Sequence, residues 1–100
     1  MFGTVARMHA KPGHEEAMLT LQRDWDETRK PTTDGAIASY VFKSEQDPDV
    51  YTLVAIFRDR ESYQKNAADP EQDAWFQKLR SHLVTDPEWR DGEIVSSSMY

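Results

Sequence analysis

The sequence contains no cysteine, which excludes disulfide bonds, thiolate nucleophiles and cysteine metal sites and suits a reducing cytoplasm. It has only four glycines and no glycine-rich phosphate loop, so we expect no nucleotide site. Its three histidines lie far apart in sequence and lack the His-x-x-x-His spacing of metal-binding helices. We therefore expect no metal site in the protein.

Basic residues are also scarce, because 12 Lys and Arg stand against 18 Asp and Glu and leave a net charge of -6. Binding to phosphate backbones or to an anionic membrane surface needs a clustered excess of Lys and Arg. We therefore expect neither nucleic acid nor a membrane as a partner. No apolar run approaches the ~20 residues of a membrane span. Arg7, His9 and Lys11 interrupt the first segment where a signal peptide needs an apolar core, so we expect a cytoplasmic protein.

The longest apolar stretch is residues 50–58, which read Val-Tyr-Thr-Leu-Val-Ala-Ile-Phe-Arg. On a strand, alternate side chains point to opposite faces, and here both sets are apolar. Such a strand needs a covering layer on each side. The chain of 100 residues is long enough for one domain, which we place over residues 1–100.

The remaining elements follow from apolar periodicity and from turn and cap residues. Asp59 is the expected N-cap of a short helix that breaks near Ala68. Asp69 then caps the next helix, with Pro70 at its first position and Gln72 placed for a capping box. The expected strands are residues 2–11, 36–43, 50–58 and 93–99, the expected helices are 14–30 and the broken pair after Asp59, and residues 85–92 are an expected loop.

This order of strand, helix, strand, strand, helix and strand is typical of the α+β ferredoxin-like βαββαβ fold. In that fold the antiparallel sheet has the order 4-1-3-2 and both helices cover the same face. The other face would expose a large apolar patch. A second copy would cover it, and ~800 Å² buried per subunit is ordinary for such an interface. We therefore expect a homodimer formed through the open sheet face.

Two stretches carry a family resemblance, in addition to the order of the elements. They are Val5-Ala6-Arg7 through Lys11-Pro12-Gly13-His14-Glu15-Glu16, and Phe57-Arg58-Asp59-Arg60-Glu61-Ser62-Tyr63 followed by Asn66 and Asp69-Pro70. With them the chain resembles, over nearly all its length, the antibiotic biosynthesis monooxygenase-like branch of the dimeric α/β-barrel superfamily. The resemblance implies a monooxygenase that uses neither metal nor flavin. It also implies a small aromatic or quinone-like ligand in a pocket between sheet and helices.

The resemblance also locates the positions that matter in the better-known members. Polyketide oxygenases of the family use a tryptophan near the end of the third strand and an asparagine nearby, and Phe57 and Leu53 occupy those positions here. Haem-degrading members use a helix histidine whose position falls near Leu79 or Arg80. His82 is out of register with it, which disfavours haem degradation. The alternative from another class is a non-catalytic small-ligand-binding or interaction protein of the same fold.

Three side chains are the candidate catalytic residues. His9 is the candidate base, since imidazole suits proton transfer near neutrality and its strand position could face the pocket. Arg7, on the same strand face, could bind an anionic substrate or instead pair with a carboxylate across the sheet. Tyr40 could line the pocket, although strand tyrosines are more often packing residues. The expected substrate-pocket residues are Tyr51, Phe57, Tyr63, Asn66 and Trp75, of which Trp75 can also be read as core.

Overall fold

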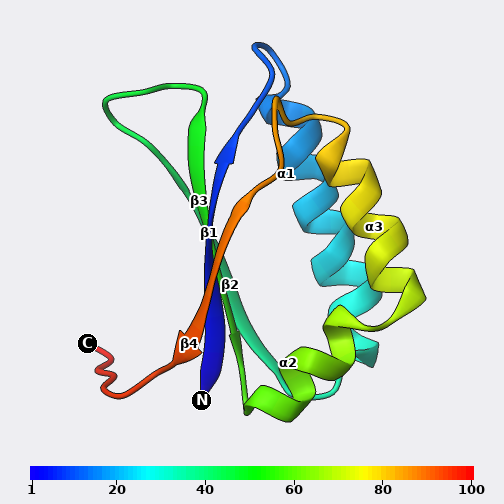
Figure 1. The fold of residues 1–100 in the computed structure, drawn as a ribbon, viewed down its shortest axis with the longest axis vertical. Coiled ribbons are helices and arrows are strands. Elements are labelled where there is room, and N and C mark those ends of the chain that lie inside the picture. Colours follow the sequence, from blue (N-terminus) through cyan, green and yellow to red (C-terminus); the bar gives the residue numbers. More distant parts are fainter.

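A four-stranded antiparallel sheet and the helices that cover one of its faces make up the computed structural model, which describes residues 1–100 (Figure 1). The elements are β1 (Phe2–His9), α1 (Glu15–Asp24), β2 (Ala36–Lys43), β3 (Val50–Phe57), α2 (Arg60–Ala67), α3 (Pro70–Arg80) and β4 (Glu88–Glu93). The sheet order β2-β3-β1-β4 is the predicted 4-1-3-2 order read from the other edge. The ferredoxin-like α+β fold is therefore confirmed.

β3 lies in the interior of the sheet, as its apolar composition predicts. It pairs with β1 from Phe2 opposite Phe57 to His9 opposite Val50, and with β2 on its other side. The side chains that β3 turns toward the helices include Tyr51 and Phe57, both buried. On β1 the residues of the same face are Thr4, Ala6 and Met8, and the small side chains of Thr4 and Ala6 leave room for the large side chains of the helices. The core cluster consists of Ala6, Met8, Ala10, Met18, Trp25, Tyr51, Leu53, Trp75, Leu79 and Leu83.

The first helical segment changes its winding along its length. The sequence predicts one helix over residues 14–30. In the structure α1 ends at Asp24, and a π-helical turn follows over Trp25–Arg29. A 3-10 turn over Lys30–Thr32, which includes Pro31, then ends the segment. The π-helical turn buries both of its end residues, Trp25 and Arg29. Such turns are rare in proteins and occur frequently at functional sites.

The break between α2 and α3 near Ala68 is confirmed. Asp59 caps α2 in a capping box with Ser62, and the hydrogen bonds from Ser62 hold the pKa of Asp59 down at about 2. Asp69 caps α3 by accepting from the backbone N–H of Glu71 at 2.9 Å. The capping box predicted for Gln72 is wrong, because the Gln72 side chain instead points toward the π-helical turn and binds Trp25 and Arg29.

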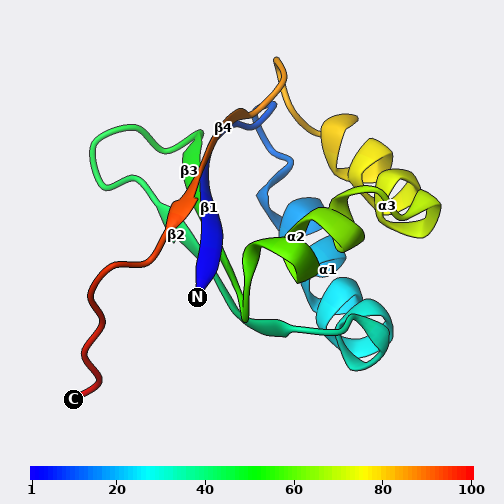
Figure 2. The same ribbon diagram turned by 60° about the horizontal axis from the view of Figure 1, so that its bottom comes forward.

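The prediction for the last strand is also wrong. β4 spans Glu88–Glu93, so all of it except Glu93 falls in the stretch predicted to be a loop, and it pairs with β1 from Phe2 opposite Glu93 to Arg7 opposite Glu88. Its six residues are all exposed and five of them are polar or glycine, as suits an edge strand whose pairing depends on its neighbour. Beyond β4, Ile94 donates one hydrogen bond to the carbonyl of Met1, and the segment then runs away from the helices (Figures 1 and 2).

All helices lie on one side of the sheet, and the opposite face carries no layer of its own (Figure 2). We call this opposite side the open face. It presents Val5, Arg7 and His9 from β1, Tyr40 and Phe42 from β2, and Thr52, Val54 and Ile56 from β3. Tyr40 and Phe42 are 56% and 59% exposed, so the predicted apolar patch is present. None of the helices has the length and apolar character needed to cross a membrane.

Candidate functional site

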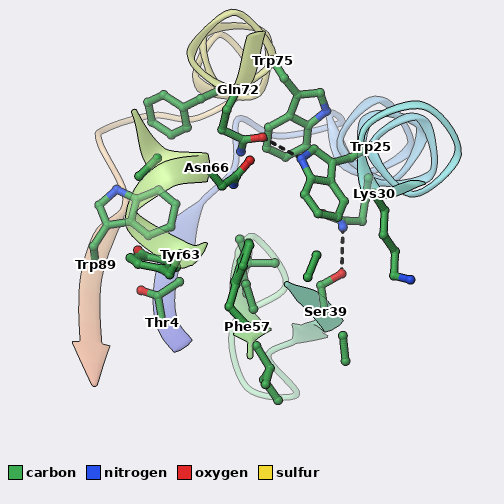
Figure 3. Close-up of a pocket in the computed structure, with 18 of the residues that line it drawn as sticks. Thr4, Trp25, Lys30, Ser39, Phe57, Tyr63, Asn66, Gln72, Trp75 and Trp89 are labelled. Atoms are coloured by element: carbon green, nitrogen blue, oxygen red, sulfur yellow. Dashed lines mark hydrogen bonds between the residues drawn. The ribbon is translucent and has the colours of Figure 1, made fainter. Parts of the chain in front are cut away.

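A cavity of about 410 Å³ lies between the helix-covered face of the sheet and the helices (Figure 3). Ligand pockets in proteins typically have volumes of ~300–1,000 Å³ and mostly apolar walls. Twelve of its 20 lining residues are hydrophobic. The lining residues are Thr4, Gln22, Trp25, Lys30, Ala36, Ala38, Ser39, Leu53, Ala55, Ile56, Phe57, Tyr63, Asn66, Ala67, Gln72, Asp73, Trp75, Phe76, Trp89 and Asp91.

Two tryptophans hold the helices over this cavity. The indole N–H of Trp75 on α3 donates to the backbone carbonyl of Leu21 on α1 at 3.0 Å. In the opposite direction, the indole N–H of Trp25 donates to Oε1 of Gln72 on α3 at 2.7 Å. Since both polar N–H groups are used between helices, the two indoles offer the cavity only their apolar surfaces.

Four further aromatic rings complete the walls. Phe57 comes from the sheet, and Tyr63 from α2 packs against it with ring centroids 5.5 Å apart. On the side of β4, Trp89 packs against Phe76 of α3 at 5.9 Å. Aromatic surfaces on several sides suit a flat, ring-containing molecule, because such rings stack or meet edge to face.

A buried arginine lies behind the cavity wall. Arg29, which is 8% exposed, donates to Oδ1 of Asn66 at 3.0 Å and to Oε1 of Gln72 at 3.3 Å. Its charge is balanced by Glu71 at 3.0 Å and by Asp69 at 3.6 Å. Buried charges persist only when they are paired and hydrogen-bonded, and Arg29 meets both conditions. The result is one rigid group that joins the π-helical turn to α2 and to the start of α3.

Two further hydrogen-bonded pairs of polar side chains lie at other parts of the wall. The phenol of Tyr63 donates to Oδ1 of Asp91 on β4 at 2.9 Å. Burial raises the pKa of Tyr63 to about 12, with the hydrogen bond to Asp91 adding to this effect, so the phenol is neutral at pH 7. On the side of β2, Nε2 of Gln22 donates to the hydroxyl of Ser39 at 3.1 Å (Figure 3).

Four of the predicted pocket residues line this one cavity, namely Phe57, Tyr63, Asn66 and Trp75. Tyr51 does not. It is 3% exposed and belongs to the hydrophobic core together with Met8.

The three candidate catalytic residues do not face the cavity. Arg7 and His9 alternate with the buried residues of β1 and are exposed on the open face. Tyr40 pairs with Val54 on the same face. The expectation that His9 points into the pocket is wrong, because the set of β1 residues covered by the helices is the one containing Ala6.

Several residues of the site were missed from the sequence. Trp89 fell in a predicted loop, and Gln72 was interpreted as a cap. Arg29 was not singled out within the predicted helix. Trp25 and Arg29 are four residues apart on one side of a helical segment, and this spacing is the signal that could have linked them.

Two histidines meet outside the cavity, although 68 positions separate them in sequence. Nδ1 of His14, before α1, lies 2.9 Å from Nδ1 of His82, after α3. Structural metal sites use three or four protein ligands, so this pair alone is short of a complete site. The contact joins the start of α1 to the turn that follows α3.

Fold and cavity together define a ferredoxin-like domain with a ligand-sized, aromatic-walled site between its sheet and its helices. The family model of the antibiotic biosynthesis monooxygenases matches residues 1–78 of the sequence. The chain belongs to the antibiotic biosynthesis monooxygenase family. No curated protein sequence matches it significantly.

Solved structures share the fold at low sequence identity. A conserved protein from Methanosarcina mazei Go1 superimposes with a TM-score of 0.80 at 19% identity, over 91% of this chain and 89% of that one. SnoaB, a cofactor-independent oxygenase from Streptomyces nogalater, gives 0.78 at 14% identity, over 96% and 94%. Rv0793 from Mycobacterium tuberculosis gives 0.78 at 15% identity, over 98% of each chain.

Proposed function

We propose that the protein binds a small, flat aromatic or quinone-like molecule in the cavity and oxygenates it with dioxygen, without metal or flavin, in the cytoplasm. The observation that carries the proposal is the cavity itself. Its volume of about 410 Å³ accommodates a molecule of two or three fused rings, and six aromatic side chains line it. Membership of the monooxygenase family supports the reaction type.

The chemistry requires a substrate that can become an electron-rich anion. An anthrone, for example, loses a proton to give an anion that can pass an electron to dioxygen. In the overall reaction a ring CH₂ group and O₂ give a carbonyl group and water. Asp91 is our candidate proton acceptor, since its carboxylate lines the cavity and already accepts a hydrogen bond from Tyr63. No histidine contributes to the cavity wall.

The second candidate function is non-catalytic binding of the same class of ligand. The observation that favours it is the absence of an imidazole from the cavity, since histidine is the commonest acid-base group of enzymes. Under this alternative the aromatic walls recognise the ring system and no bond changes.

We also propose that the protein is a homodimer in which a second copy covers the open face. Val5 on β1 and Tyr40 and Phe42 on β2 are each 45% or more exposed there, on the two strands that flank β3. A contiguous apolar surface of this kind marks an interaction site, and two copies of the same face are complementary to each other in polarity.

Anthrone is the probe for turnover. We expect the protein to accelerate oxygen uptake and anthraquinone formation above the uncatalysed rate, in the presence of EDTA and without added flavin. Ala55→Phe fills the cavity from β3 and should abolish both binding and turnover. Ala74→Phe adds the same ring to α3 at an exposed position outside the cavity wall, and should leave both unchanged.

The outcomes separate the two candidate functions. Binding of anthrone that Ala55→Phe abolishes, with no acceleration of oxygen uptake, would replace the oxygenase by the non-catalytic binding protein. Failure of the wild-type protein to bind any flat two-ring or three-ring molecule would refute both functions.

A further inference from the structure

Two side-chain amides, those of Asn66 and Gln72, line the cavity while their oxygen atoms are already in use (Figure 3). Oδ1 of Asn66 accepts from Nη2 of Arg29 at 3.0 Å. Oε1 of Gln72 accepts from Nε of Arg29 at 3.3 Å and from the indole N–H of Trp25 at 2.7 Å. One guanidinium group therefore holds both amides next to each other.

The chemistry of these partners fixes which way each amide is turned. A guanidinium and an indole N–H can only donate hydrogen bonds, so only the amide oxygen can face them. The NH₂ groups of Asn66 and Gln72 must then point elsewhere, and no protein acceptor binds either of them. No side-chain nitrogen or oxygen in the protein is both buried and unpartnered, so both NH₂ groups reach accessible space.

Arg29 has the properties of a rigid support. Its guanidinium is buried at the end of the π-helical turn, and Glu71 and Asp69 neutralise it from the start of α3. It does not line the cavity. Arg29 therefore acts on a ligand only through the two amides, as a positioning residue.

We infer that Asn66 and Gln72 form a pair of hydrogen-bond donors, set by Arg29, that selects ligands carrying an acceptor oxygen, either a carbonyl or a phenolate. This inference rests on the proposed function, because it assumes that the cavity takes a small ring-containing molecule. Two fixed donors next to one oxygen also stabilise negative charge that develops on it. The pair thus matches the enolate or phenolate form that oxygenation of an aromatic substrate requires.

The test compares two ligands of similar shape, 1,4-naphthoquinone and naphthalene, by equilibrium dialysis. Only the quinone carries acceptor oxygens, and the protein has no cysteine thiol for it to alkylate. A hydrogen bond contributes ~1 kcal/mol net, so two bonds predict that the wild-type protein binds the quinone about tenfold or more tightly than naphthalene.

Asn66→Asp and Gln72→Glu are the informative variants. Each keeps the oxygen that binds Arg29 and replaces the NH₂ donor by a second acceptor of nearly the same size. We expect each to reduce the quinone preference at least fivefold, with naphthalene affinity within twofold of the wild type. Gln22→Glu is the matched control, because it adds the same charge to the same cavity at a residue whose NH₂ is already bound to Ser39. It should keep the preference.

Arg29→Lys tests the positioning role, since a single ammonium cannot reproduce the planar fork that holds both amides. The preference for the quinone should fall while naphthalene still binds. An equal loss of affinity for both ligands would show that Arg29 has a purely structural role.

Two further results would overturn the inference. Equal binding of quinone and naphthalene by the wild-type protein would refute the donor pair and leave the proposed aromatic site intact. An unchanged preference in both Asn66→Asp and Gln72→Glu would refute it as well. Binding of neither ligand would instead refute the proposed function, and the inference with it.

Discussion

Tyr63 contributes to the stability of the fold in a way that depends on pH. Its pKa is raised to about 12, chiefly by burial and then by the hydrogen bond to Asp91. A tyrosine in an unfolded chain titrates near pH ~10. The stabilisation is therefore fully present below pH ~10 and is lost as the pH rises through about 12, because the unfolded chain loses the proton first.

The variant Tyr63→Phe isolates this effect. At pH 7 we expect it to lower the free energy of unfolding by ~1 kcal/mol, through loss of the hydrogen bond to Asp91. The difference from the wild type should stay constant to pH ~9 and shrink between pH ~10 and 12. Urea unfolding of both proteins across this range measures it, and contributions from other tyrosines cancel in the difference. A constant difference up to pH 12 would contradict the raised pKa.

At the residue scale, alternation along a strand predicts which side chains share a face but not which face is covered. In β1 the set containing Ala6 and Met8 and the set containing Arg7 and His9 were both admissible as the pocket side. The charges of the second set were the physical signal, since charged groups are left on the side that helices do not bury. On α2 and α3 the helical periodicity of the apolar residues was enough to predict which side faces the sheet, and Trp75 faces the cavity.

At the element scale, the turn before β2 is locked to the start of α2. Gly35 has a φ of 82°, and its carbonyl accepts from the N–H of Arg58 at 2.7 Å. A Cβ at Gly35 would lie 2.5 Å from Cβ of Ser62, which belongs to the capping box of α2. Replacement of this glycine therefore disturbs two elements at once.

Gly35→Ala should lower the free energy of unfolding by ~2–4 kcal/mol, since the left-handed backbone and the clash with Ser62 add together. Gly13 offers a matched control because it has the same φ of 82° and no atom within 4 Å of an added Cβ. Gly13→Ala should lower the free energy of unfolding by only ~1–2 kcal/mol. Chemical denaturation of the two variants gives both values, and equal losses would show that the contact with Ser62 is unimportant.

Elements with strong local signals were predictable, and those that depend on a neighbour were not. β2 and β3 were predicted to within a residue because their apolar runs are bounded by turn residues. β4 was missed because its sequence Glu-Trp-Arg-Asp-Gly-Glu has little strand preference and its pairing depends on β1. The π-helical turn was also missed, since nothing in the periodicity of residues 25–29 distinguishes it from an α-helix.

At the scale of the whole molecule, the open face predicts self-association. We expect the protein to be dimeric at micromolar concentration by analytical ultracentrifugation. Phe42→Asp places a charge where the second copy would pack and removes an apolar side chain whose burial is worth ~2 kcal/mol, so the dimer should dissociate at least tenfold more readily.

Ala74→Asp is the control for this experiment, because Ala74 is exposed on α3, among the helices that cover the other side of the sheet. Its dimer should be unaffected. A wild-type protein that is monomeric at micromolar concentration, or a Phe42→Asp variant that dimerises as the wild type does, would exclude the open face as the interface.

The π-helical turn makes the length of the chain critical at one place. A residue inserted or deleted in an α-helix rotates everything beyond it by about 100°. Between α1 and the 3-10 turn, such a change would carry Arg29 away from Asn66 and Gln72. The loop between β2 and β3 holds no residue of the cavity wall and tolerates variation in length. Homologues that retain the arginine-held amides should therefore vary in length at that loop and keep the spacing from Trp25 to Lys30 unchanged.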